Sequence, residues 1–444
     1  MVMLGTTISL LLLIPAVIAT SINHGEAMQD AQKIISDHIH KYYEPLKGGL
    51  CEGNTCCNIT ATESCPITKF AKDTSNLILP GGNTRCIFSS STPYAFQVIP
   101  GDTDNLLFYF QGGGACWDEW STTTGGFCTT DVAPQSLIGA FDRTNPKNAF
   151  KSYTIVHVLY CSGDVHSGNT VRSYNDASGQ PVVQVGLVNA QAALDWVQQQ
   201  VKAGYLASTF SNLVIMGCSA GSIGAQMWGQ ELLSKLKWQK AAVVPDSYAG
   251  VFPDNSLGPL IYDFGFCSSG FLNDALYKKC MNQELTLEAL NLDFMTNNPF
   301  VPYSFIQSKT DAVQISFYIS IATSTNATQK TITPAQFYKK VNDLFADYNT
   351  ARRNFVTYLV DGDHHCFTPY SLFFEADTKG AEDNGATTST QLMSDWANQL
   401  PLSSGQAIDT RCDGDLQTIN TNLSAPDTTY CSSDVVPKEF VEPF

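Results

Sequence analysis

Apolar residues along the chain recur with two periods, one typical of buried strands and one typical of helices. Strand-like runs predict strands at 94–99, 105–110, 152–160, 213–216, 301–308 and 354–360. Helical spacing predicts an amphipathic helix over 22–47 and further helices over 189–203 and 336–349. Strands that alternate with helices predict an α/β fold with a mostly parallel central sheet flanked by helices.

Two segments depart from this rhythm. Residues 48–90 are rich in cysteine, and we expect a disulfide-pinned lobe with little sheet of its own. Residues 255–300 have weak periodicity and contain Cys267 and Cys280, so we interpret them as an excursion that could form a roof over a site.

The amino terminus carries an apolar run at 8–18, closed by the small-residue pattern Val17-Ile18-Ala19. This pattern predicts a signal peptide over 1–19, followed by a single elaborated domain over 20–444. The run is too short to cross about 30 Å of hydrocarbon, and no later segment reaches about 18 apolar residues. We therefore expect a secreted protein without stable membrane insertion.

Cysteine usage agrees with export. An even set of 14 cysteines indicates disulfides formed in an oxidising compartment. Zinc binding is the competing interpretation, but the spacing lacks paired C-x-x-C knuckles, so no metal is expected. Three glycosylation sequons, at Asn58, Asn326 and Asn422, fit a secretory route and predict surface positions.

The formal charge of −16 disfavours two classes of partner, nucleic acids and anionic membrane surfaces, because both would repel the protein at long range. It does not bear on a neutral ester. The composition, 43% hydrophobic, is ordinary for a globular protein.

The central motif is Gly217-Cys218-Ser219-Ala220-Gly221, a G-x-S-x-G between the predicted strand 213–216 and a predicted helix. A serine on such a strand-to-helix turn is held in a strained conformation that exposes its Oγ, and small neighbours remove steric conflict. A plain glycine turn is the alternative. The context favours Ser219 as a nucleophile.

A serine nucleophile requires a histidine base. His24, His38 and His40 precede the sheet and are most simply solvated, whereas His157 fits a core position within a strand. His364 and His365 follow the strand 354–360, late in the chain, where the base of a Ser-Asp-His hydrolase falls. We favour His365 because a disulfide at Cys366 would hold its loop. A polar turn and a metal cluster are the alternatives.

The orienting acid should lie between the serine and the histidine. Asp311 follows the strand 301–308 and preserves the order Ser, Asp, His. Asp246 also follows a strand and is the rival, whereas Asp164 precedes the serine and has the wrong order.

Three glycines, Gly112-Gly113-Gly114, follow the strand 105–110. Bare backbone at a strand end lets N–H groups point into a cleft, as an oxyanion hole requires. A phosphate loop is excluded because no Lys-Ser/Thr follows. The expected donors are the amides of Gly113, Gly114 and Ala220.

Taken together, QGGGACW (111–117), YCSGD (160–164), GCSAG (217–221), Asp246-Ser247 and His365-Cys366 resemble, in this order, the pectin acetylesterase and Notum family. The resemblance implies an α/β-hydrolase-like fold and a secreted carboxylesterase with no cofactor. It implies the triad Ser219, Asp311 and His365, with Gly113 and Gly114 in the oxyanion loop. Plant-type members carry Trp directly after the glycines; here Ala115 stands there and Trp117 comes two residues later. We also hypothesise that Cys116 pairs with Cys128.

Three functions are compatible with these patterns. The first is deacetylation of an acetylated polysaccharide such as pectin, although an anionic backbone would need a local basic patch or a neutral glycan in its place. The second is removal of a longer acyl group from a lipid or an acylated protein, in a pocket built from Phe264, Phe266, Phe271 and Phe294. The third is a catalytically inactive binding protein on the same fold.

Overall fold

A computed structural model describes residues 24–43, 50–51, 55–351, 354–380, 391–403, 406–408, 410–412 and 440–441. The predicted signal peptide and the Asn422 sequon lie outside these residues. Asn58 and Asn326 are exposed, as glycosylation would require. No helix in the described part of the chain is long and apolar enough to cross a membrane.

The main sheet of the described residues has nine strands in the order β1-β2-β3-β5-β4-β8-β9-β10-β11. β3 runs antiparallel to both of its neighbours, β2 and β5, and the other pairings are parallel. The strands are β1 (Thr55–Asn58), β2 (Asn76–Leu79), β3 (Phe96–Ile99), β4 (Asp102–Phe110), β5 (Tyr153–Val158), β8 (Phe210–Cys218), β9 (Trp238–Asp246), β10 (Tyr303–Ser308) and β11 (Phe355–Val360).

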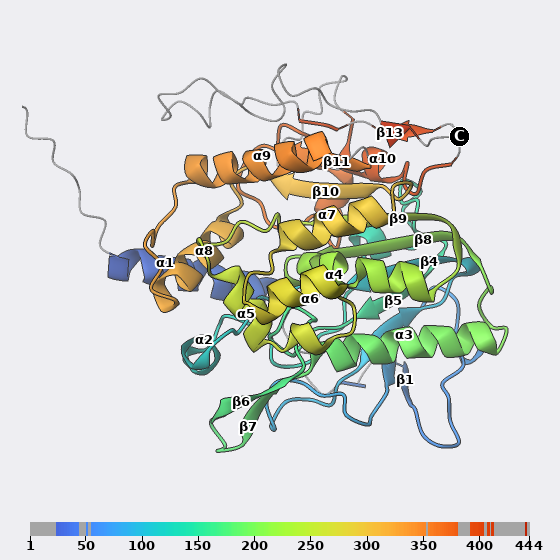
Figure 1. The fold of residues 1–444 in the computed structure, drawn as a ribbon. Helices are drawn as coiled ribbons and strands as arrows, with labels where there is room; N and C mark the ends of the chain where they lie inside the picture. The colour runs from blue at the N-terminus through green and yellow to red at the C-terminus, as the bar shows by residue number, and fades with distance from the viewer. Residues whose placement is uncertain are drawn as a thin grey trace, which may run out of the picture.

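Helices connect and cover these strands (Figure 1). They are α1 (His24–Tyr42), α2 (Glu119–Thr124), α3 (Gly186–Lys202), α4 (Ala220–Lys235), α5 (Leu257–Asp263), α6 (Asp274–Met281), α7 (Leu287–Asn297), α8 (Ala312–Ser324), α9 (Pro334–Ala351) and α10 (Met393–Ala397). Two small antiparallel pairs stand apart: β6 (Thr170–Asn175) with β7 (Pro181–Gln184), and β12 (Ala407–Ile408) with β13 (Phe440–Val441). The fold is an α/β-hydrolase-like fold, as predicted.

The second halves of β4, β8 and β9 are buried on both faces of the sheet, which is why these halves are largely apolar. Along β4, Leu106, Phe108 and Phe110 enter one apolar core, whereas Leu107 and Tyr109 enter the other. The first core includes side chains of α3, α4, α7 and α9, and the second includes side chains of α10. The parallel strands end on the side where α1, α5 and α8 gather (Figure 1).

In the cysteine-rich segment 48–90, the strands among the described residues are β1 and β2, of four residues each, and both belong to the main sheet. β1 and β2 pair with each other in parallel, and β2 joins the main sheet through β3. Disulfides Cys51–Cys56 and Cys57–Cys65 tie the residues around β1, so this short strand keeps its place at the sheet edge. The apolar run of β2, Asn76–Leu79, is too short to be told from a loop by its period alone.

Disulfides also cross-link distant parts of the fold. Cys116–Cys128 closes the segment after the triple glycine, which confirms the predicted pair. The other long-range bonds among the described residues are Cys86–Cys161, Cys267–Cys280 and Cys218–Cys366.

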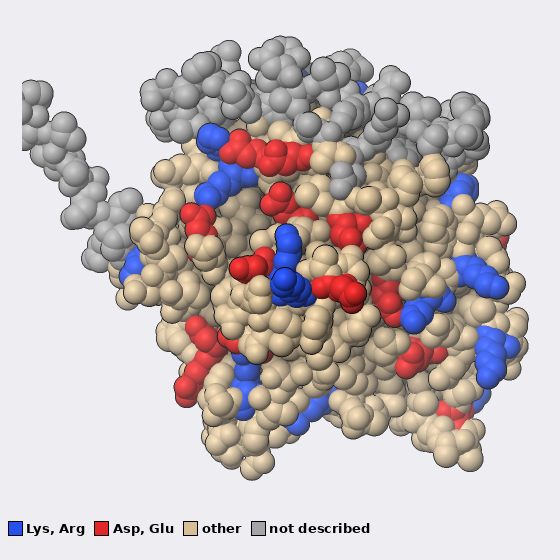
Figure 2. All heavy atoms as spheres, viewed as in Figure 1, with Lys and Arg blue, Asp and Glu red and all other residues tan. Residues whose placement is uncertain are grey.

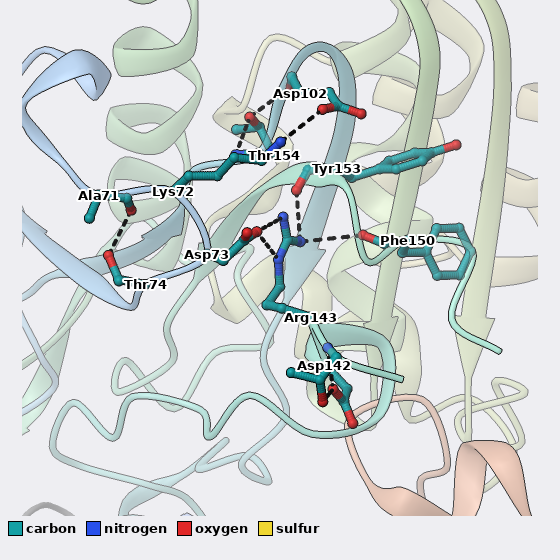
Figure 3. A network of polar contacts seen from close by, with 12 residues as sticks. Ala71, Lys72, Asp73, Thr74, Asp102, Asp142, Arg143, Phe150, Tyr153 and Thr154 are labelled. Atoms are coloured by element: carbon teal, nitrogen blue, oxygen red, sulfur yellow. Dashed lines mark hydrogen bonds and ion pairs between the residues drawn. The ribbon is translucent and has the colours of Figure 1, made fainter. Parts of the chain in front are cut away.

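Arg143 links the segment that leads into β5 to the loop of Asp73 (Figure 3). Its buried guanidinium contacts Asp73 Oδ1 through Nε and Nη2, each at 2.8 Å. Nη1 donates to the carbonyl oxygens of Tyr153, at 2.9 Å, and Phe150, at 3.4 Å. One planar side chain thus satisfies two backbone acceptors and a carboxylate.

Arg143→Ala should therefore lower the free energy of unfolding by about 2 kcal/mol, because it leaves two carbonyls and a carboxylate without their donor. Urea unfolding followed by tryptophan fluorescence measures the change. Lys147→Ala, on an exposed residue of the same loop, is the matched control and should change stability by less than about 0.5 kcal/mol. Equal stabilities for the two variants would show that the Arg143 network is not stabilising.

Candidate active site

Ser219 lies at a sharp turn between β8, which ends at Cys218, and α4, which begins at Ala220. Its backbone has φ 58° and ψ −123°, a conformation that L-residues rarely adopt. The neighbours must be glycine, because a Cβ on Gly217 would lie 2.2 Å from the Gly221 carbonyl oxygen, and one on Gly221 would lie 2.0 Å from that of Phe110. The backbone therefore has the form of a nucleophile elbow.

His365 and Asp311 are hydrogen-bonded to each other inside the protein. The distance between His365 Nδ1 and Asp311 Oδ2 is 2.7 Å. Asp311 is fully buried, and it also accepts hydrogen bonds from the backbone and side-chain nitrogens of Gln314, at 2.9 and 2.8 Å. His365 Nε2 is buried and has no hydrogen-bond partner among the described residues. The imidazole is thus oriented at one nitrogen, with the other left to accept a proton.

A disulfide links the loop of His365 to the turn of Ser219. Cys366 is bonded to Cys218, so the residue after the histidine is tied to the residue before the serine. Ser247 Oγ accepts the Cys366 amide at 2.9 Å, which holds the same loop from a third segment. The Cys218–Cys366 disulfide thus holds the loop of His365, as the sequence predicted for Cys366.

Asp246, the rival acid, serves the loop that follows His365. Its Oδ2 accepts from the amides of Phe367 and Thr368, at 2.9 and 2.7 Å, and from Thr368 Oγ1 at 2.7 Å. Burial raises the pKa of this carboxyl, and its hydrogen bonds act in the opposite direction. Ser247 Oγ donates to Oδ1 at 2.7 Å, so both oxygens of Asp246 are already bonded within the protein.

The triple-glycine loop follows β4 and passes next to Ser219. The Cβ position of Gly112 is 3.1 Å from Ser219 Cβ and 2.3 Å from the Tyr43 hydroxyl oxygen, so only glycine fits there. Gly113 and Gly114 have φ values of 140° and 75°, which also favour glycine. Among the described residues no hydrogen-bond acceptor is recorded for the amides of Gly113, Gly114 or Ala220.

His166 supports this loop and was overlooked in the sequence. Its Nε2 bonds to the Gln111 carbonyl oxygen at 2.7 Å, next to the first glycine, and its ring is buried against Phe110 and Tyr160. Burial lowers the pKa of His166 to about 4, so the ring is neutral and donates to the carbonyl. Asp164 lies nearby but accepts from Ser162 Oγ and the Gly186 amide, which agrees with its exclusion as the acid.

A narrow cavity opens beside Ser219. Its free volume is about 40 Å³, and Gly114 and Ala220 line it together with the serine, whereas Gly113 does not. Apolar side chains from several elements form the rest of the wall: Ala115, Trp117, Val165, Ile223, Met227, Tyr248, Phe252, Leu257, Leu260, Ile261, Phe264, Phe317 and Ile321. Helix α5 therefore contributes to the wall of the site from within the segment interpreted as a roof.

Two sequence interpretations of the surroundings were wrong. Of the four phenylalanines suggested for an acyl pocket, only Phe264 lines the cavity; Phe266 and Phe294 are core residues, and Phe271 packs against that core. His38 is not simply solvated, because its ring centroid lies 4.9 Å from that of His365. No local sequence pattern indicates this contact, because His38 and His365 lie far apart in the chain. His157 is a core residue as expected, with Nδ1 2.9 Å from Gln97 Oε1.

Metal ligation has little support among the described side chains near the site. Candidate ligand atoms of His38, His365 and Cys366 lie within 4.8 Å of one another, but the disulfide removes the Cys366 thiolate. Two imidazoles remain, fewer than the three protein ligands of a typical catalytic zinc site.

The sequence model of one family, described as pectinacetylesterase, matches residues 81–409. The chain belongs to the pectinacetylesterase family. The matched region includes Ser219, Asp311 and His365, whereas α1 precedes it. Among solved structures, the Wnt deacylase Notum from Drosophila is similar, with 16% identity and a TM-score of 0.43 over 67% of this chain and 87% of that chain. No curated protein matches.

Ala115, and not a tryptophan, directly follows the three glycines. Trp117 nevertheless lines the cavity, and its Nε1 donates to Ser324 Oγ at 2.8 Å. The bulk of a tryptophan is therefore still present beside the serine, supplied from two residues further along the chain.

Proposed function

We propose that this protein is a secreted serine carboxylesterase that removes short acyl groups, foremost acetyl, from an acetylated polysaccharide such as pectin. The observation that carries the proposal is the 2.7 Å hydrogen bond between His365 and Asp311, on a loop that a disulfide joins to the turn of Ser219. Family membership supports ester hydrolysis, and the disulfides support an oxidising, extracellular setting.

In the proposed mechanism, His365 Nε2 takes the Ser219 proton while Oγ attacks the ester carbonyl carbon. The negative charge that develops on the carbonyl oxygen is stabilised by the amides of the glycine loop and of Ala220. The tetrahedral intermediate collapses, His365 returns the proton to the departing alcohol oxygen, and an acyl-enzyme remains. Water, deprotonated by His365, then releases the carboxylic acid and restores Ser219.

The size of the cavity favours a short acyl group. A water molecule needs roughly 10–15 Å³ of such free volume, so 40 Å³ admits only a few heavy atoms. An acetyl group fits this space, whereas a 16-carbon chain would require the wall of the cavity to move.

The charge of the surface bears on the alcohol part of the ester. On the face shown in Figure 2, Lys and Arg side chains are interspersed with acidic ones and form no basic patch. The net charge of −16 would in addition repel a long polyanionic backbone at long range. A neutral or highly esterified glycan is therefore the better substrate class.

A second candidate function is removal of a longer acyl group from a lipid or an acylated protein. The observation that favours it is the apolar wall that extends from Trp117 to Phe264 and Phe317, more than an acetyl group would need. Outward movement of α5 would lengthen the cavity along this wall.

An ester series separates the two functions. We expect the purified protein to hydrolyse 4-nitrophenyl acetate and butyrate, with kcat/KM at least about 10-fold lower for octanoate and palmitate, because these longer chains exceed the available space. Acetate release from acetylated pectin and from a neutral acetylated xylan, measured in parallel, tests the glycan. Rates that rise with chain length would favour the second function, and no turnover by folded protein would favour a binding protein.

A further inference from the structure

Helix α1 forms part of the wall around the candidate active site, although it precedes the family match. Its apolar side, with Ile35 and Ile39, is buried, and Ile39 Cδ1 lies 3.0 Å from the Cβ position of Gly114. The Tyr43 hydroxyl, just after the helix, is 2.3 Å from the Cβ position of Gly112. The helix is therefore in direct contact with the glycine loop.

The same helix places His38 against His365. The two rings meet edge to face, with centroids 4.9 Å apart and planes inclined by 76°. His38 Nε2 is buried and has no hydrogen-bond partner among the described residues. A substrate atom that reached this nitrogen would therefore give it a hydrogen-bond partner that the described residues do not supply.

The proposed mechanism indicates which part of the ester, acyl or alcohol, lies nearest to His38. His365 Nε2 must deliver its proton to the departing alcohol oxygen, so groups that flank His365 face the alcohol part of the ester. The acyl cavity is lined by other residues, and neither His38 nor His365 is among them. His38 is thus placed on the alcohol side of Ser219.

We propose that His38 is a substrate-binding residue that hydrogen-bonds through Nε2 to a hydroxyl or ring oxygen of the sugar carrying the ester. This inference rests on the proposed esterase function and extends it to recognition of the alcohol part. Tyr42, with its ring centroid 4.7 Å from that of His38, is half-buried and offers an aromatic surface for the sugar C–H groups. The buried Tyr370 supports it from behind, with ring centroids 4.2 Å apart.

The charge state of His38 suits a neutral partner. Burial and the neighbouring His365, His364 and Lys41 hold the pKa of His38 well below its usual value. The ring is therefore uncharged at neutral pH and offers either a donor or an acceptor at Nε2. A sugar hydroxyl can satisfy both forms.

The test compares two acetyl esters that differ only in the alcohol part: a mono-acetylated methyl galactoside and 4-nitrophenyl acetate, which has no hydroxyl. His38→Ala should raise KM for the sugar ester about 3- to 10-fold, the usual value of one neutral hydrogen bond. Its kcat should stay within about 2-fold, as should both constants for 4-nitrophenyl acetate. His38→Gln, which keeps a polar nitrogen near this position, should recover part of the loss.

His40→Ala, on an exposed residue of the same helix, is the matched control and should leave both substrates unchanged. Equal losses on the two esters, or a shifted pH profile of kcat/KM on both, would show that His38 acts by packing on His365 and would overturn the inference alone. Wild-type protein without Ser219-dependent turnover of either ester would overturn the proposed function, and the inference with it.

Discussion

Ser219→Ala is expected to lower kcat for acetyl-ester hydrolysis by about 10⁴-fold or more, because no acyl-enzyme can form without the hydroxyl. The residual rate over water would come from the oxyanion-hole amides and substrate binding. Stopped assays of 4-nitrophenol release, with the melting temperature measured on the same preparation, give the rate and verify folding. Ser234→Ala, at the exposed end of α4, is the control for loss of a hydroxyl and should retain full activity.

His365→Ala should lower kcat as much as Ser219→Ala does. The double variant should lower kcat little further, because the two residues act as a unit. His364→Ala is the matched control on the adjacent residue, and its rate should change only modestly. Its ring packs on Phe367, 5.2 Å between centroids, and no bond to Asp311 is recorded for it. Equal and severe losses in His364→Ala and His365→Ala, or additive losses in the double variant, would contradict the proposed base.

Asp311→Asn should also have a large effect, with an expected fall in kcat of about 10⁴-fold. Asparagine keeps an oxygen that can accept the Gln314 amide and so preserves the cap of α8. With that oxygen facing Gln314, the NH2 group of the asparagine faces His365 Nδ1 and can only donate a hydrogen bond to it. The ring therefore adopts the tautomer in which Nδ1 is unprotonated and Nε2 carries the proton. That tautomer cannot take the Ser219 proton. Steady-state kinetics on 4-nitrophenyl acetate measure the loss.

A comparison of Asp246→Asn with Asp311→Asn separates the loss of His365 orientation from a loss of folding stability. Asp246 Oδ2 accepts three hydrogen bonds from residues 367 and 368, so replacing it with an amide should lower the melting temperature as well as the rate. Asp311→Asn should lower the rate with a much smaller change in melting temperature. The reverse pattern, with activity retained in Asp311→Asn and lost from folded Asp246→Asn, would assign the acid to Asp246.

Much of the framework could be predicted from local pattern. The strands around β4, β5, β8, β10 and β11 are long apolar runs buried on both faces, so their presence is encoded in composition alone. The nucleophile turn could be predicted because its G-x-S-x-G motif is contiguous in the chain. Gly217 is required by a contact four residues away, with Gly221, whereas Gly221 is required by the remote carbonyl of Phe110 on β4. Helix α8 was not predicted, since its residues are apolar around most of the helix and carry no clear helical period.

The choice between adjacent residues needed the tertiary structure. His364 and His365 belong to the same loop, and composition cannot tell which ring faces the protein interior; the structure pairs His365 with Asp311 at 2.7 Å. The roles of Asp246 and His166 were equally hidden, because their partners, the backbone of residues 367–368 and of Gln111, come from distant segments.

The sequence by itself thus determined most elements of the central sheet, the family and the candidate motifs, because each element and each motif depends on residues close together in the chain. Only the tertiary structure decided which groups meet. The free volume beside Ser219 and the contact of His38 with His365 arise where the strand ends, α1 and α5 converge. Such contacts between segments remote in sequence are set by packing of whole elements, and no local pattern encodes them.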